Sequence, residues 1–169
     1  AAVAETKLAP FAEEIEKMLQ RLLTQPLPGL KTAFCLQDVK QKQVELEFLY
    51  PLPPGFLKGF IDLVFFHDGR YFLVDWKSNY LGEGAAAYGW ENMEKAMRAH
   101  DYYLQAAIYA EAFARLLQAT KMPGVFGGMY YIFLRGLTEG SSAQGIFHFM
   151  PDGALLDQRN LAQRLACTV

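Results

Sequence analysis

The chain has 169 residues, of which 52% are hydrophobic and 20% charged, a composition that is typical of a folded globular domain and excludes a disordered tail. This length suits one domain whose core is large enough to need no metal or disulfide for stability. The 16 basic and 18 acidic residues give a formal charge of -2. The chain as a whole therefore does not attract nucleic acid by its charge, and any contact with DNA must be local or helped by a partner.

The sequence shows neither the apolar run of a membrane-spanning helix nor a cysteine pattern typical of disulfides or zinc sites. No apolar run approaches the roughly 20 residues that a membrane-spanning helix needs. Cys35 and Cys167 lie far apart without C-x-x-C spacing, so neither a zinc site nor a disulfide framework is predicted. We therefore expect a cytoplasmic protein with no membrane partner. Because the chain starts at Ala1 without Met, we expect residues 1–169 to be a single domain cut from a longer polypeptide.

The first half of the chain predicts one amphipathic helix followed by three strands. Apolar residues recur at helical spacing until Pro26, and a later run alternates apolar and acidic residues, with Glu45 and Glu47 on one strand face. The next two β-rich runs are joined by an Asp-Gly pair, which predicts a hairpin. These elements cover Phe11–Leu23, Gln43–Tyr50, Gly59–Phe66 and Arg70–Trp76.

The second half predicts one long helix, two strands and a closing helix after a glycine-rich loop. The long helix would bury a face that includes Ala106, Ala107 and Phe113. The order of elements predicts an α/β fold in which helices pack on a mixed sheet. These later elements cover Asn92–Gln118, Gly127–Leu134, Gly145–Met150 and Ala154–Ala166.

Three charged residues of the predicted hairpin are candidates for chemistry. Asp62 lies in its first strand, and Asp75 and Lys77 share one face at the end of its second strand. Antiparallel pairing would bring the two carboxylates close together, and hard oxygen ligands of this kind suit Mg²⁺. A lysine beside such an ion can offset charge on a phosphate undergoing hydrolysis. The alternative is a surface ion pair and a hairpin acid, although both acids interrupt strongly apolar runs, where an unpaired charge is costly.

The sequence around these residues resembles a known nuclease family. Gly59-Phe60-Ile61-Asp62 and the run from Gly69 to Gly82, with Asp75-Trp76-Lys77-Ser78 in it, are similar to the C-terminal nuclease domains of RecB-type proteins, the beta subunits of exonuclease V. These domains belong to the PD-(D/E)xK nuclease superfamily. Gln105 and Tyr109 match the Q-x-x-x-Y helix motif of the RecB-like branch, and the segment from Gly127 to Gly136 is similar to its late strand. The resemblance runs from Phe11 to Leu156.

This resemblance implies a restriction-endonuclease-like sheet flanked by helices and assigns roles to individual residues. It makes Asp62, Asp75 and the backbone carbonyl of Trp76 the Mg²⁺ ligands and Lys77 the catalytic lysine. Glu45 matches an acidic position that contacts the metal through water, and Glu47 on the same face is an alternative for that role. Gln105 and Tyr109 are the implied DNA-binding motif, with packing against the core as the alternative.

The resemblance also implies an activity and partners. The expected activity is Mg²⁺-dependent hydrolysis of DNA by a helicase-nuclease that processes double-strand breaks, together with RecC-like and RecD-like subunits and a RecA-type recombinase. RecB-type domains carry a metal-binding histidine upstream of the matched region, and we assign that role to none of His67, His100 and His148. We therefore expect residues 1–169 alone to be a weak or inactive nuclease. The alternatives are a degenerate fold that docks recombination partners and a stand-alone restriction or repair nuclease.

Overall fold

The chain folds around a mixed sheet whose five strands lie in the order β1-β2-β3-β4-β5. The computed structural model describes residues 7–31, 33–52, 55–138 and 144–151. Strands β3 and β4 are parallel, and the other neighbouring pairs are antiparallel. The predicted mixed α/β sheet flanked by helices is confirmed, while the predicted helix Ala154–Ala166 lies outside the described residues. The strands are β1 (Gln41–Leu52), β2 (Gly55–His67), β3 (Arg70–Lys77), β4 (Val125–Phe133) and β5 (Ile146–Phe149).

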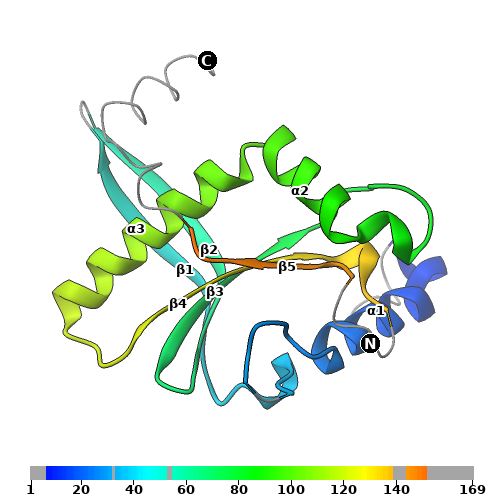
Figure 1. Cartoon of the computed structure of the whole chain (residues 1–169), viewed down its shortest axis with the longest axis horizontal. Helices are drawn as coiled ribbons and strands as arrows, with labels where there is room; N and C mark the ends of the chain where they lie inside the picture. Colours follow the sequence, from blue (N-terminus) through cyan, green and yellow to red (C-terminus); the bar gives the residue numbers. More distant parts are fainter. Residues whose placement is uncertain (1–6, 32, 53–54, 139–143, 152–169) are drawn as a thin grey trace.

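Helices cover both faces of the sheet, as Figure 1 shows. Helices α2 (Trp90–Ala99) and α3 (Tyr102–Thr120) lie on one face, where Met93, Met97 and Phe113 pack into the larger core cluster. Helix α1 (Ala12–Thr24) lies on the other face and adds Leu22 to the second cluster. A parallel strand pair needs such a crossover, so α2 and α3 connect β3 to β4 across the first face. Among the described residues, no helix is long and apolar enough to cross a membrane.

The prediction of one long helix over Asn92–Gln118 is wrong, because the chain turns at His100 and Asp101. Asp101 adopts a left-handed backbone with φ 53°, and aspartate tolerates this conformation better than most residues. The amide of His100 still bonds to Ala96, while the carbonyl of Asp101 accepts the amide of Gln105 at 3.1 Å and starts α3. No glycine or proline marks the break, so helical periodicity alone did not reveal it.

Strand β1 also runs past its predicted end at Tyr50. Pro51 pairs with Phe56, and the hairpin continues to Leu52 opposite Gly55. Proline is tolerated there because β1 is an edge strand, where a missing amide hydrogen breaks no ladder on the open side.

The side chains of β1 and β2 stop alternating regularly between the two sheet faces at one position, where Glu45 lies opposite Asp62. The register stays constant from Val44 with Leu63 to Leu46 with Ile61. Ile61 and Val64 nevertheless pack in the same core cluster, although a regular strand would send residues three apart to opposite faces. Glu45, which lies between the two pairs, has a left-handed backbone with φ 51°. This irregularity lets the far end of the hairpin pack against α3 through Tyr50 and Ile108.

We predict that Gly136 is required for the fold near the end of β3. A Cβ atom at Gly136 would lie 2.4 Å from Cβ of Tyr88, whose hydroxyl group contacts Asn79 and Leu81 in the loop after β3. We expect Gly136→Ala to lower the free energy of unfolding by about 1–3 kcal/mol in urea denaturation. Gly55→Ala is the control, because its Cβ would meet nothing within 4 Å, and it should change stability by less than about 0.5 kcal/mol. Equal stabilities of the two variants would contradict the prediction.

Candidate active site

Asp75 and Lys77 form a buried ion pair at the carboxyl end of β3. The strand alternation that predicts a shared face is confirmed, since Nζ of Lys77 lies 2.6 Å from Oδ2 of Asp75. Asp75 is 4% exposed and Lys77 is 8% exposed, and they are two of the three buried polar or charged residues in the described part of the chain. Such burial is unusual for both residue types and requires that their polar atoms have partners.

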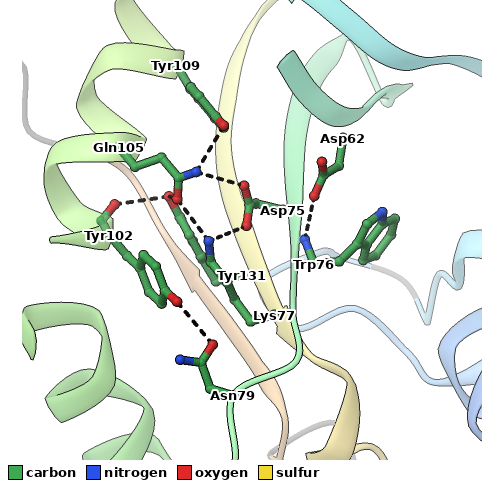
Figure 2. Close-up of polar contacts among 9 residues, drawn as sticks. All are labelled: Asp62, Asp75, Trp76, Lys77, Asn79, Tyr102, Gln105, Tyr109 and Tyr131. Atoms are coloured by element: carbon green, nitrogen blue, oxygen red, sulfur yellow. Dashed lines mark hydrogen bonds and ion pairs between the residues drawn. The ribbon is translucent and has the colours of Figure 1, made fainter. Parts of the chain in front are cut away.

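Gln105 of α3 supplies those partners, as Figure 2 shows. Its Oε1 accepts hydrogen bonds from Nζ of Lys77 at 3.0 Å and from the hydroxyl of Tyr131 at 3.1 Å. Its Nε2 donates to Oδ1 of Asp75 at 3.2 Å and to the hydroxyl of Tyr109 at 2.9 Å. Both amide hydrogens of Gln105 are therefore used and its oxygen accepts from Lys77, while the single hydroxyl hydrogen of Tyr131 is shared between Gln105 and the carbonyl oxygen of Tyr102.

Two tyrosine rings complete the surroundings of Lys77. Its Nζ lies 3.7 Å from the ring centroid of Tyr102 and 5.1 Å from that of Tyr131. The hydroxyl of Tyr102 donates to Oδ1 of Asn79 at 3.1 Å, and the hydroxyl of Tyr131 lies 3.0 Å from the carbonyl oxygen of Tyr102. Tyr102 lies three residues before Gln105 and so shares its helix face, whereas the sequence gives no role to Tyr131. Only the parallel register, in which Tyr131 pairs with Asp75, brings Tyr131 here.

Asp62 lies beside this network without joining it. If the register of β2 and β3 continued, Asp62 would lie opposite Asp75, but the regular pairing ends one residue earlier, at Leu63 with Val74. The carboxylate of Asp62 instead accepts the amide of Trp76 at 2.9 Å, as drawn in Figure 2. Asp62 is half-buried, so one candidate acid is enclosed and the other reaches the surface.

The electrostatics of Asp75 reflect this enclosure. Burial is the largest influence and raises the pKa of Asp75 above its ordinary value, while the hydrogen bond and charge of Lys77 lower it and the charge of Asp62 raises it. The pKa of Tyr109 is raised by burial and then by the charge of Asp75. The charge of Asp62 is thus the smallest of the four influences on the pKa of Asp75.

The two glutamates of β1 have different surroundings. Glu47 forms an exposed ion pair with Lys58, with an Nζ–Oε1 distance of 2.9 Å. Glu45 is exposed and, by the register of its neighbours, lies opposite Asp62. The structure does not bring Glu45 into a cluster with the aspartates, since the described residues contain no group of three or more His, Cys, Asp or Glu arranged to hold a metal.

The donor atoms near Asp62 suit a hard divalent cation. The carboxylates of Asp62 and Asp75 and the backbone carbonyl of Trp76 are all oxygen donors on adjacent strands, and Mg²⁺ uses one or two protein carboxylates together with water. Within the described part of the chain, Oδ1 of Asp62 receives no protein hydrogen bond, so it keeps capacity for a further ligand. These oxygen donors are of the type that Mg²⁺ prefers, although the described residues form no cluster of three or more His, Cys, Asp or Glu.

Each of the three histidines stacks on an aromatic ring. The ring of His67 stacks on Phe34 with centroids 3.8 Å apart, and that of His148 stacks on Tyr130 at 4.2 Å. Burial lowers the pKa of His148. His100 stacks on Tyr102 at 5.3 Å, at the turn between α2 and α3.

The enclosed Asp75 and Lys77, the adjacent Asp62 and the mixed sheet fit a known family. The sequence pattern of the PD-(D/E)XK nuclease superfamily matches residues 2–168, and the chain belongs to this superfamily. Among its relatives are the RecBCD enzyme subunits RecB. The chain is 36% identical to the Escherichia coli subunit over 188 residues, which cover 89% of the chain and 16% of the relative.

Other RecB subunits match shorter stretches. Identity is 41% with the Haemophilus influenzae subunit, over 62% of the chain and 9% of that subunit. It is 40% with the Mycobacterium tuberculosis subunit, over 60% of the chain and 10% of that subunit. The chain thus spans less than one fifth of the length of these relatives.

We predict that the charge of Asp75 makes stability depend on pH. Its folded-state pKa is raised, so the carboxylate form is less favourable in the folded than in the unfolded chain. This shift stabilises the folded chain fully at pH values below the pKa of Asp75 in the unfolded chain. The stabilisation is lost as pH rises through the pKa of Asp75 in the folded chain. Relative to Asp75→Asn, the wild type should therefore lose free energy of unfolding over that range, measured by urea denaturation between about pH 4 and 8. A difference that stays constant with pH would contradict this.

Proposed function

We propose that the chain is the Mg²⁺-dependent DNA nuclease domain of a RecBCD-type helicase-nuclease and hydrolyses DNA phosphodiester bonds during double-strand break repair and recombination. The observation that carries this proposal is the buried Asp75–Lys77 pair beside Asp62 at the end of β3. A docking module has no need for two enclosed charges, whose desolvation is costly. Membership of the nuclease superfamily and the likeness to RecB subunits support the nuclease.

In this proposal Asp62, Asp75 and the carbonyl of Trp76 hold the cation. A bound Mg²⁺ supplies Lewis acidity and a more acidic water. Lys77 places a positive charge where negative charge develops on the phosphate during hydrolysis. Its ammonium needs no reorganisation to act, because Asp75 and Gln105 already orient it.

Gln105 and Tyr109 were predicted to contact DNA, and their contacts favour a more specific role for the first. The amide of Gln105 contacts Lys77, Asp75, Tyr109 and Tyr131. We propose that Gln105 keeps the ion pair in place and that Tyr109, whose hydroxyl accepts from Gln105, faces the DNA path. RecC-like and RecD-like subunits, a RecA-type recombinase and a cytoplasmic location complete the proposal.

We expect the carboxylate and the lysine to be essential for cleavage. In a RecB-like polypeptide that carries this chain, Asp75→Ala and Lys77→Ala should each reduce Mg²⁺-dependent degradation of linear DNA by at least about 100-fold, since each removes a group that acts in the transition state. Lys58→Ala is a matched control, because Lys58 is exposed and its contacts with Glu47 and with the ring of Phe60 lie at the surface. The 169-residue chain tested alone should cleave weakly.

Retention of cleavage by both Asp75→Ala and Lys77→Ala would overturn the nuclease proposal. If unwinding were kept and cleavage lost, the effect would belong to the nuclease site rather than to a folding defect.

A second prediction separates the two glutamates of β1. We expect Glu45→Gln to lower the rate of cleavage, because Glu45 lies opposite Asp62 and would act through water near the cation. Glu47→Gln should cleave like the wild type, because Glu47 is engaged with Lys58. The measurement is the initial rate of Mg²⁺-dependent cleavage of a labelled linear DNA. The opposite ranking of the two variants would assign the role to Glu47.

A further inference from the structure

We infer that Tyr102 is a positioning residue whose ring holds the ammonium of Lys77 beside Asp75. This inference rests on the proposed nuclease function. It concerns a residue outside the Asp-Asp-Lys motif and outside the Gln105–Tyr109 pair, and it explains why an aromatic ring lies in the site.

The ammonium of Lys77 has three hydrogens and, in the described part of the chain, three near neighbours, while the ring of Tyr131 lies farther away at 5.1 Å. Oδ2 of Asp75 lies at 2.6 Å, Oε1 of Gln105 at 3.0 Å and the ring centroid of Tyr102 at 3.7 Å. A cation over the face of an aromatic ring is attracted by the electron density of that face, and the attraction is larger where water is excluded. The side chain of Lys77 is only 10% exposed, so the third contact acts in a largely desolvated place.

The ring of Tyr102 is itself held in position. Its hydroxyl donates to Asn79, in the loop directly after β3, at 3.1 Å. The ring is roughly parallel to that of Tyr131, with centroids 5.6 Å apart and an interplanar angle of 21°. The turn at Asp101 sets where α3 begins and therefore where Tyr102 lies. Contacts with the loop after β3 and with β4, together with its place at the start of α3, thus fix the position of the ring.

An aromatic ring restrains the ammonium of Lys77 better than another carboxylate would. Asp75 already places one negative charge 2.6 Å from the ammonium of Lys77. A further acid beside Lys77 would repel Asp75, whereas an aromatic face attracts the ammonium and carries no net charge. Lysine has a long flexible side chain, so a neutral contact that restricts it keeps its charge at the reacting phosphate.

The test compares three substitutions. Tyr102→Leu removes the ring, Tyr102→Phe keeps the ring and loses only the bond to Asn79, and Tyr80→Leu removes a tyrosine that is 65% exposed in the loop after β3. In the RecB-like polypeptide, Tyr102→Leu should lower kcat for Mg²⁺-dependent cleavage by about 10- to 30-fold and change KM by less than about 2-fold. Tyr102→Phe should restore most of the loss, and Tyr80→Leu should match the wild type.

A second readout does not depend on activity. Protons above a ring face are shifted upfield in a nuclear magnetic resonance spectrum, so the side-chain ammonium signal of Lys77 should be upfield in the wild-type chain and in Tyr102→Phe. The signal should move to an ordinary position in Tyr102→Leu. The signal is assigned by its loss in Lys77→Ala, and circular dichroism checks that each variant is folded.

Three results would overturn the inference. They are an unchanged kcat in Tyr102→Leu, a loss in Tyr102→Phe as large as in Tyr102→Leu, and a Lys77 signal that is the same in Tyr102→Leu as in the wild type. The second result would assign the effect to the bond with Asn79. Failure of the proposed function is distinct, because cleavage would then survive Lys77→Ala, whereas failure of this inference alone leaves Lys77→Ala inactive.

Discussion

Two opposite charges lie almost fully buried at the end of β3, and such a pair is stable in a protein only when its remaining hydrogen-bonding capacity is used. Each oxygen of Asp75 has one side-chain partner, Oδ2 with Lys77 and Oδ1 with Gln105. The amide nitrogen and the amide oxygen of Gln105 in turn both have partners. Removing any member would leave a buried polar atom without a partner, so these residues form one unit rather than separate contacts.

The topology of the sheet explains why residues so far apart in sequence form this unit. Strands β3 and β4 are parallel, so the chain must cross over between them, and α2 and α3 make that crossing. The first turns of α3 lie where β3 ends, and β4 runs beside β3 with Tyr131 next to Asp75. One crossover connection therefore brings the strand end, the helix face and the neighbouring strand to a single place.

Much of this arrangement could be predicted from the sequence, because it depends on local periodicity. The period of two along a strand places Asp75 and Lys77 on one face, and the period of the helix places Gln105 and Tyr109 on one stripe. The turn at Asp101, the reversal at Glu45 and the approach of Tyr131 could not be predicted in this way. The first two are left-handed backbones at residues other than glycine, and the third depends on a pairing between strands that are separated by two helices.

The same limit applies to Asp62. Antiparallel pairing predicts Asp62 opposite Asp75, but the regular ladder stops one residue earlier, and the carboxylate of Asp62 turns to the amide of Trp76. The two acids are consequently unlike: Asp75 is enclosed and held by two side chains, whereas Asp62 is half-buried and receives one backbone hydrogen bond. A site built from this pair has one fixed acid that orients Lys77 and one acid with an oxygen that remains accessible to an added ligand. This difference arises at a single irregular position of the hairpin, where Glu45 lies opposite Asp62 and the side chains of β1 and β2 change faces.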